Sequence, residues 1–299
     1  MVDMNLNRRD FLQAVAVTGV AGSVVPAIAS EKKRPKLRIA VKYGMIGEGK
    51  TPLEKLELVK SLGFEGVEID SPSNIDLAAL KSACEKTGVV MHGTIDSVHW
   101  GKPLSSPDAA VRAEGLKGLE TAIRDAHYFG APTALLVPGV ARGGVSYDEC
   151  FERSAAEVKK VLPLAEELKV VIGIETVWND FITKPEQMVD YVDQFKSPWV
   201  GAYFDCSNMV KYGVPSATWI RTLGKRLVKF DFKGFNMNDF KQGKPGWCKI
   251  GDGTEDWPEV LTALAEVGYN GFATSEVGGG GREVLADIAA RMKKVLELA

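Results

Sequence analysis

The chain has 299 residues, a formal net charge of −2 at pH 7, and 45% hydrophobic against 25% charged residues. These values are ordinary for a soluble globular protein, and they allow one large domain or two small ones. Because the net charge is small and no run of basic residues follows Lys36, neither nucleic acid nor an anionic membrane surface is expected as a partner.

The first thirty residues differ from the rest. Residues 7–12 form a twin-arginine pattern around Arg8 and Arg9, an uncharged run extends from Phe11 through Ile28, and residues 27–29 provide an A-x-A cleavage site. The run is rich in Ala and Gly and shorter than the ~20 residues that a membrane span usually needs. This favours a cleaved signal at residues 1–29 over a retained anchor or a buried N-terminal helix.

That signal predicts recognition by the twin-arginine export machinery and a periplasmic or secreted mature protein. No stable membrane association is expected after cleavage. The oxidising compartment permits disulfides, but the four cysteines, Cys84, Cys150, Cys206 and Cys248, are irregularly spaced and form no C-x-x-C. Neither a disulfide framework nor a thiolate zinc site is therefore predicted.

Residues 30–36 form a charged linker, and strand and helix patterns then alternate to the end of the chain. The predicted strands are residues 37–41, 66–70, 89–93, 133–137, 170–175, 199–205, 227–233 and 270–276. The predicted helices are residues 52–63, 74–86, 108–129, 147–168, 184–195, 216–223, 258–267 and 282–298. The first helix has a capping box made by Thr51 and Glu54, with Pro52 at the first helical position.

This alternation predicts a single-domain (β/α)8 TIM barrel over residues 37–299. A doubly wound sheet is the main competitor. A doubly wound sheet would more often have a Gly-rich turn after the first strand, and residues 43–47 match that pattern only weakly.

Residues 227–233 show the most informative strand pattern. Val228, Phe230 and Phe232 alternate with Lys229, Asp231 and Lys233. Because side chains on a strand point to opposite faces with period two, one face is apolar and the other is charged. A solvated edge strand would show the same pattern, but the two phenylalanines favour a face packed under helices and a charged face that looks into a site.

Four acidic residues fall at or near the C-terminal ends of four successive predicted strands: Glu175, Asp205, Asp231 and Glu276. Functional groups of a TIM barrel gather at that end. Four converging acids repel one another unless a cation joins them, and an all-oxygen set favours Mg²⁺ or Mn²⁺. Each acid taken singly could instead cap a helix or pair with a neighbouring base.

Two lysines on the charged face of the seventh strand could balance the remaining negative charge. Lys233 could also hold a substrate oxygen, whereas Lys229, deeper in the strand, is expected to pair with Glu68 or another acid inside the barrel. His127 falls inside a predicted helix and is expected to be structural.

Further substrate contacts are predicted around the barrel mouth. His92 lies on the third strand, where a buried core histidine is the alternative, and His99 and Trp100 lie in the loop beyond it. Trp178 and Asn179 follow Glu175 and are placed for stacking and hydrogen bonding. Trp247, Lys249 and the glycines at 278–281 are weaker candidates.

No G-x-S-x-G, P-loop or H-E-x-x-H appears in the sequence, and Ser, His and Asp do not assemble into a recognisable order, so acyl transfer has no support. Several segments together resemble the sugar phosphate isomerase/epimerase family with the xylose-isomerase-like TIM barrel. The segments that carry this resemblance are residues 64–68, 100–108, 136–139, 174–179, 203–205, 212–215, 251–253 and 256–257.

The resemblance implies a divalent ion, Mn²⁺, Mg²⁺ or Co²⁺, bound by Glu175, Asp205, Asp231 and Glu276. The family frequently has His-x-Lys-Asp on the seventh strand, whereas this chain has Asp231-Phe232-Lys233-Gly234. Asp can still bind a metal, but this departure puts the metal preference and part of the substrate contact in question. The implied reaction is removal of a proton next to a carbonyl, with Glu175 and Glu276 as the catalytic pair.

The resemblance leaves three outcomes open: epimerisation, aldose-ketose isomerisation, or β-elimination from a 3-keto-glycoside. Because sugar phosphates are cytoplasmic metabolites, the export signal favours an unphosphorylated keto-sugar. The endonucleases of the superfamily need several histidines, and this chain has 3. A non-catalytic sugar-binding barrel remains an alternative, but binding alone would not require two flanking acids. A homo-oligomer is neither predicted nor excluded.

Overall fold

The computed structural model describes residues 34–297. The predicted export signal at residues 1–29 lies outside the described residues. Cys84, Cys150, Cys206 and Cys248 are all free thiols in the structure. Within residues 34–297, none of the helices is long and apolar enough to span a membrane.

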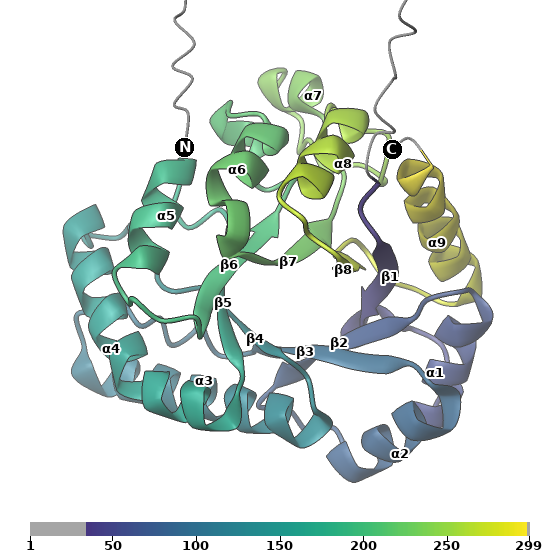
Figure 1. The fold of residues 1–299 in the computed structure, drawn as a ribbon, viewed down its shortest axis with the longest axis horizontal. Coiled ribbons are helices and arrows are strands. Elements are labelled where there is room, and N and C mark those ends of the chain that lie inside the picture. The colour runs from purple at the N-terminus through teal and green to yellow at the C-terminus, as the bar shows by residue number, and fades with distance from the viewer. Residues whose placement is uncertain (1–33, 298–299) are drawn as a thin grey trace, which may run out of the picture. The chain divides into compact units, whose positions relative to one another are not determined.

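Eight parallel strands close into one barrel in chain order, and helices surround it (Figure 1). The strands are β1 (Leu37–Lys42), β2 (Gly66–Ser71), β3 (Val90–Asp96), β4 (Thr133–Leu136), β5 (Val171–Glu175), β6 (Val200–Asp205), β7 (Leu227–Phe232) and β8 (Gly271–Ser275). This closed barrel confirms the predicted (β/α)8 fold and excludes the doubly wound sheet.

The outer layer contains the predicted helices and one short helix that was not predicted. The α-helices are α1 (Pro52–Ser61), α2 (Leu77–Thr87), α3 (Ala109–Phe129), α4 (Tyr147–Leu168), α5 (Pro185–Asp193), α6 (Ser216–Leu223), α7 (Met237–Lys241), α8 (Trp257–Glu266) and α9 (Arg282–Leu296). The capping box of Thr51 and Glu54 is present at the start of α1. Helix α7 interrupts the expected loop because the Asn236 side chain caps it by accepting from the N–H groups of Asn238 and Asp239.

Strand β7 has the two faces that its alternation predicted. Phe230 and Phe232 are fully buried in the core outside the barrel, where Phe232 meets Trp257 of α8 edge to face at 4.7 Å. Lys229 and Asp231 are 4% and 0% exposed on the opposite face, which looks into the barrel. The packing of the two phenylalanines against the helices therefore sets the direction of the charged side chains.

Strand β3 contains a β-bulge, so that the consecutive residues His92 and Gly93 both face the barrel interior. Val67 pairs with Met91 and Glu68 with Gly93, so the register skips one residue at His92. A Cβ on Gly93 would lie 2.5 Å from Oε1 of Glu68, which explains why glycine stands there. Beyond this bulge the direction of the side chains changes, and the Thr94 hydroxyl donates to the carbonyl of Ala122 in α3 at 2.9 Å.

The bulge places His92 in a buried charged layer at the centre of the barrel. Lys229 Nζ lies 3.3 Å from Oε1 of Glu68, donates to the carbonyl of His92 at 2.6 Å and contacts His92 Nδ1. The His92 ring stacks on Phe272 at 4.0 Å. This pairing of Lys229 with Glu68 is the one expected from the sequence, and Lys229 is therefore a structural residue of the barrel interior.

The buried ion pair of Lys229 with Glu68 gives a prediction for the stability of the fold. Lys229→Met leaves Glu68 without its cationic partner in a site closed to water, so the free energy of unfolding should fall by about 3–5 kcal/mol. Urea denaturation followed by circular dichroism measures this change.

The double variant Glu68→Gln, Lys229→Met removes both charges and provides the control. It should be less destabilised than the sum of the two single variants, because the partners contact each other. A loss below about 1 kcal/mol in Lys229→Met would contradict a charged, paired layer.

Candidate active site

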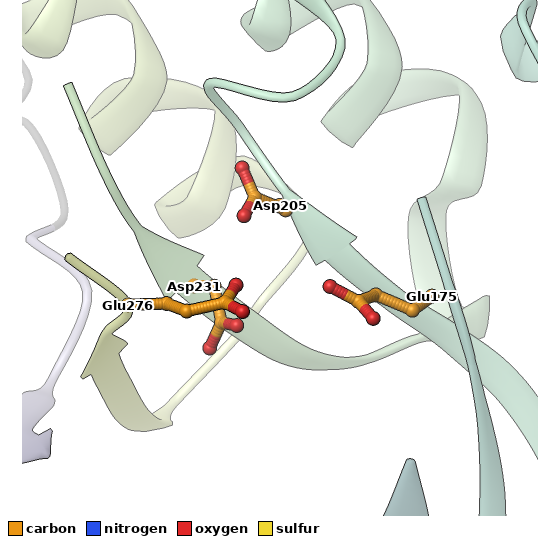
Figure 2. Close-up of side chains that lie close together, drawn as sticks. All are labelled: Glu175, Asp205, Asp231 and Glu276. Carbon is orange, nitrogen blue, oxygen red and sulfur yellow. The ribbon is translucent and has the colours of Figure 1, made fainter. Parts of the chain in front are cut away.

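Four successive strands each bring one acid to the C-terminal mouth of the barrel: Glu175 from β5, Asp205 from β6, Asp231 from β7 and Glu276 directly after β8. One carboxylate oxygen from each acid lies within 4.8 Å of one from every other. Figure 2 shows Glu175 and Glu276 pointing toward each other from opposite sides, with Asp205 above them and Asp231 overlapping Glu276 in this view. The structure thus brings together all four residues that the sequence singled out.

Two lysines enter this acid cluster. Lys233 Nζ lies 2.7 Å from Oε2 of Glu276 and 3.0 Å from Oδ2 of Asp205. Lys42 Nζ lies 3.1 Å from Oδ2 of Asp231 and 3.2 Å from Oε1 of Glu276. Glu276 is therefore held by a different lysine at each of its two oxygens.

Lys42 was missed in the sequence, although a signal for it existed. It is the last residue of β1, where Ile39 and Val41 belong to the core between barrel and helices. Arg38 and Lys42 alternate with them on the other face, and the Arg38 guanidinium lies 3.9 Å from the centre of the Phe272 ring inside the barrel. The same period-two argument that identified Asp231 would have identified Lys42.

The charges of this group leave a deficit that one divalent cation would fill. Four carboxylates against the two lysines Lys42 and Lys233 leave a net charge of −2 when all six groups are ionised. Buried charges must be compensated, because removing them from water is costly. A single divalent ion would bring the group to neutrality.

The oxygens that face one another in the cluster are shared between two ammonium groups. Oδ2 of Asp205 and Oε2 of Glu276 pair with Lys233 at 3.0 Å and 2.7 Å, and Oδ2 of Asp231 pairs with Lys42 at 3.1 Å. A carboxylate oxygen has more than one lone pair, so these atoms can still bind a cation. The four acids, an all-oxygen donor set, therefore fit a hard or borderline divalent ion such as Mg²⁺, Mn²⁺ or Co²⁺.

The acids differ in how easily they ionise. Burial raises the pKa of Glu175 well above its ordinary value, and the charge of Glu276 raises it further. Burial also raises the pKa of Asp205 and of Asp231, against the opposing effect of Lys233 and Lys42 respectively. Burial acts in the same direction on Glu276, but Lys42 and Lys233 outweigh it and lower the pKa of Glu276 to about 2.

Hydrogen bonds fix the orientation of the two aspartates. Oδ1 of Asp205 accepts from the backbone N–H groups of Ser207 at 2.9 Å and Asn208 at 2.8 Å, which leaves Oδ2 facing the cluster. The Tyr203 hydroxyl lies 2.7 Å from both Asp231 Oδ1 and Glu68 Oε2. Tyr203 thus connects the acid cluster to the buried layer beneath it.

The predicted substrate residues fall into different surroundings. His92 is 1% exposed and belongs to the buried layer with Lys229. Asn179 is fully buried, and its amide is engaged by the backbone: it donates to the Gly139 carbonyl at 2.8 Å and accepts from the Phe181 N–H at 3.2 Å. In this conformation both side chains support the barrel and its loops, and a contact of either with substrate stays a prediction.

His99 and Trp100 lie in the loop after β3, with their rings edge to face at 5.8 Å. Nδ1 of His99 accepts from the Val137 N–H at 3.2 Å, so the proton of the neutral ring is assigned to Nε2. Burial lowers the pKa of His99 to about 4, which keeps the ring neutral and able to donate one hydrogen bond. Trp100 is 50% exposed.

Trp178 forms an aromatic wall with residues of the loop that follows β7. It stacks on Trp247 at 5.0 Å and meets Phe235 edge to face at 5.6 Å. Its Nε1 donates to the Asn208 carbonyl at 2.7 Å. Lys233 Nζ lies 5.4 Å from the centre of the Trp247 ring, so this wall adjoins the acid cluster.

Known proteins resemble this chain in sequence. The sequence profile of a family described as xylose isomerase-like TIM barrel matches residues 56–296. L-ribulose-5-phosphate 3-epimerase of Escherichia coli O1:K1 is 27% identical over 238 residues, which cover 75% of this chain and 81% of that protein.

Solved structures show the same fold. D-allulose 3-epimerase from Methylomonas sp. in complex with D-allulose superposes with a TM-score of 0.71 at 18% identity, over 87% of this chain and 98% of that one. The 3-keto-D-glucoside 4-epimerase of Escherichia coli superposes with a TM-score of 0.72 at 16% identity, over 87% and 99%. At these identities the structural likeness supports the barrel and leaves the chemistry to be argued from the site.

The raised pKa of Asp231 gives a prediction for the metal-free protein. The folded state retains this proton to a higher pH than the unfolded state, so the contribution of Asp231 to the stability of the wild type should fall as the pH rises from about 4 toward neutrality. Asp231→Asn cannot ionise. Its free energy of unfolding relative to wild type should therefore increase with pH in EDTA, as measured by urea denaturation.

At pH 7, added Mn²⁺ should make the wild type more stable than Asp231→Asn, because the ion stabilises the wild type and binds the variant weakly. Two results would speak against the site: a pH-independent difference between the two proteins, or equal stabilisation of both by Mn²⁺.

Proposed function

This chain belongs to the xylose isomerase-like TIM barrel family, and we propose that it is a divalent-metal-dependent sugar epimerase or isomerase that acts on an unphosphorylated keto-sugar. The observation that carries the proposal is the convergence of four acids and two lysines at the barrel mouth with a net charge of −2. The epimerase names of the relatives in sequence and structure point to the same class of reaction.

Glu175, Asp205, Asp231 and Glu276 would hold the ion. A divalent ion held there would act as a Lewis acid and polarise the carbonyl of a keto-sugar, which acidifies the neighbouring C–H. The hydrogen bonds to Oδ1 of Asp205 and Oδ1 of Asp231 orient these two side chains before anything binds. Such preorganisation reduces the reorganisation needed during the reaction.

Glu175 and Glu276 are the proton-transferring pair. Epimerisation removes a proton from one face of a carbon and returns one to the opposite face, so it needs one carboxylate and one carboxylic acid on either side of the substrate. The two side chains come from β5 and β8 and face each other (Figure 2). In the metal-free protein their pKa values are shifted in opposite directions, so the two carboxyl groups are not equivalent.

Lys42 and Lys233 control this difference. Both contact Glu276, at 3.2 Å and 2.7 Å, and hold it as an anion. The structure gives Glu175 no lysine partner at ion-pair distance within residues 34–297, and Glu175 is 5% exposed. In the metal-free protein the lysines therefore favour the anionic form of Glu276 over that of Glu175.

Two observations favour an unphosphorylated substrate. The twin-arginine pattern around Arg8 and Arg9 predicts export, away from the cytoplasmic pool of sugar phosphates. At the site, Lys42 and Lys233 already pair with the acids, so neither is free to neutralise a phosphate group. A sugar without phosphate needs no such counter-charge.

A deuterium-exchange experiment tests the reaction. With Mn²⁺ in D₂O, the protein should incorporate deuterium next to the carbonyl of a ketose, detected by NMR. Glu175→Gln and Glu276→Gln should each lower epimerisation by about 10²–10⁴-fold. Because each glutamate serves one face of the carbon, each variant should retain exchange from one epimer only.

Glu167→Gln, an exposed change on α4, is the matched control and should behave as wild type. Bound Mn²⁺ per chain is measured for every variant, which separates loss of the ion from loss of proton transfer. Release of an aglycone from a 3-keto-glycoside would instead identify β-elimination. Sugar binding without any exchange would leave a non-catalytic sugar-binding barrel.

Export is tested separately with the full-length chain. Replacing Arg8 and Arg9 together by lysine should hold the protein in the cytoplasm, because the twin-arginine machinery reads this pair. Immunoblots of periplasmic and cytoplasmic fractions measure the distribution. Unchanged export of the Lys-Lys variant would contradict the proposed route.

A further inference from the structure

A large cavity adjoins the acid cluster on the side of β8. Its volume is about 780 Å³, within the range of small-molecule sites. Lys233 and Glu276 form its inner wall, and the remainder lies between the loop at residues 247–250 and helix α9. The cavity therefore starts at the reacting groups and extends away from them.

Ion pairs hold the two outer walls together. Lys249 Nζ lies 2.9 Å from Oδ2 of Asp287 on α9. Arg291 of α9 reaches back to Asp252 at 2.9 Å and donates to the carbonyl of Ile250 at 3.1 Å. These contacts connect the loop at residues 247–250 to α9, the two walls of the cavity.

The cationic side chains that line the cavity already have carboxylate partners. The three pairs are Lys233 with Glu276, Lys249 with Asp287, and Arg291 with Asp287. Glu283 adds negative charge in the first turn of α9, where an anion would otherwise be favoured. These walls disfavour a phosphate group.

The remaining surface suits a flat, uncharged ring. Trp247 rests on Trp178 and is still 44% exposed, and Val284 is 43% exposed. Val277 and Ile288 complete an apolar wall. Exposed tryptophan beside aliphatic side chains provides a surface for the apolar face of a ring, with gain from both burial and stacking.

We propose that this cavity is a subsite for a second, uncharged ring attached to the keto-sugar, so that the substrate is a glycoside rather than a free monosaccharide. This inference rests on the proposed function, because it places the reacting sugar at the acid cluster. The ring is either another sugar or an aryl aglycone, since both present a flat apolar face to tryptophan.

The test compares two free keto-sugars, each with its own substituted forms. D-fructose is compared with isomaltulose and lactulose, which carry a second sugar, and with D-fructose 6-phosphate; 3-keto-D-glucose is compared with phenyl 3-keto-β-D-glucoside, which carries an aryl group. The wild-type protein with Mn²⁺ should show kcat/KM for deuterium exchange at least about tenfold higher for a ring-bearing substrate than for its own free keto-sugar. The better of the sugar and aryl arms identifies the ring.

Two variants connect the preference to the cavity. Val284→Trp narrows the cavity at its apolar wall and Trp247→Leu removes the stacking surface, and each should lower the ratio of ring-bearing to free substrate by about tenfold. Ala290→Trp, an equally bulky change at an exposed position of α9 outside the cavity, should leave the ratio unchanged.

Binding of the same sugars is measured in parallel by calorimetry, so that the subsite is judged even without turnover. Absence of exchange with every substrate would reject the proposed function, while a Val284→Trp effect on binding of the ring-bearing sugar would still support the subsite. Two results would overturn the subsite proposal. One is a preference for D-fructose 6-phosphate, and the other is a ratio of ring-bearing to free substrate that Val284→Trp leaves unchanged in both exchange and binding.

Discussion

Concentration of negative charge at the mouth of the barrel is the constraint on which the site depends. Four carboxylates that approach within 4.8 Å of one another cannot all ionise without cations. Lys42 and Lys233 provide half of the compensation, and the buried layer of Lys229 and Glu68 balances itself beneath them. The remaining deficit of two charges suits one divalent ion.

The lysines give the site an asymmetry that the four acids alone would not have. Both contact Glu276, so this acid stays ionised, whereas Glu175 on the opposite side is protonated more readily. The large cavity also lies on the side of Glu276. The same half of the mouth therefore combines the fixed anion with the space for a larger substrate.

Much of this arrangement was predictable from period-two patterns in single strands. The alternation in β7 identified both the packed phenylalanines and Asp231, and it placed Lys229 beside Glu68. Lys42 was missed because the predicted first strand ended at residue 41, one position too early. The bulge at His92 depends on a contact between distant segments, Gly93 with Glu68, which local patterns do not contain. The short helix α7 was missed although its cap at Asn236 is a local signal.

Diffraction from crystals grown with Mn²⁺ tests the central claim most directly, with data collected at the manganese absorption edge. The account predicts one anomalous peak per chain, bound by oxygens of Glu175, Asp205, Asp231 and Glu276, with Lys42 and Lys233 retained as neighbours of the acids. No peak among these four side chains at saturating Mn²⁺, with the lysines alone compensating the carboxylates, would contradict it.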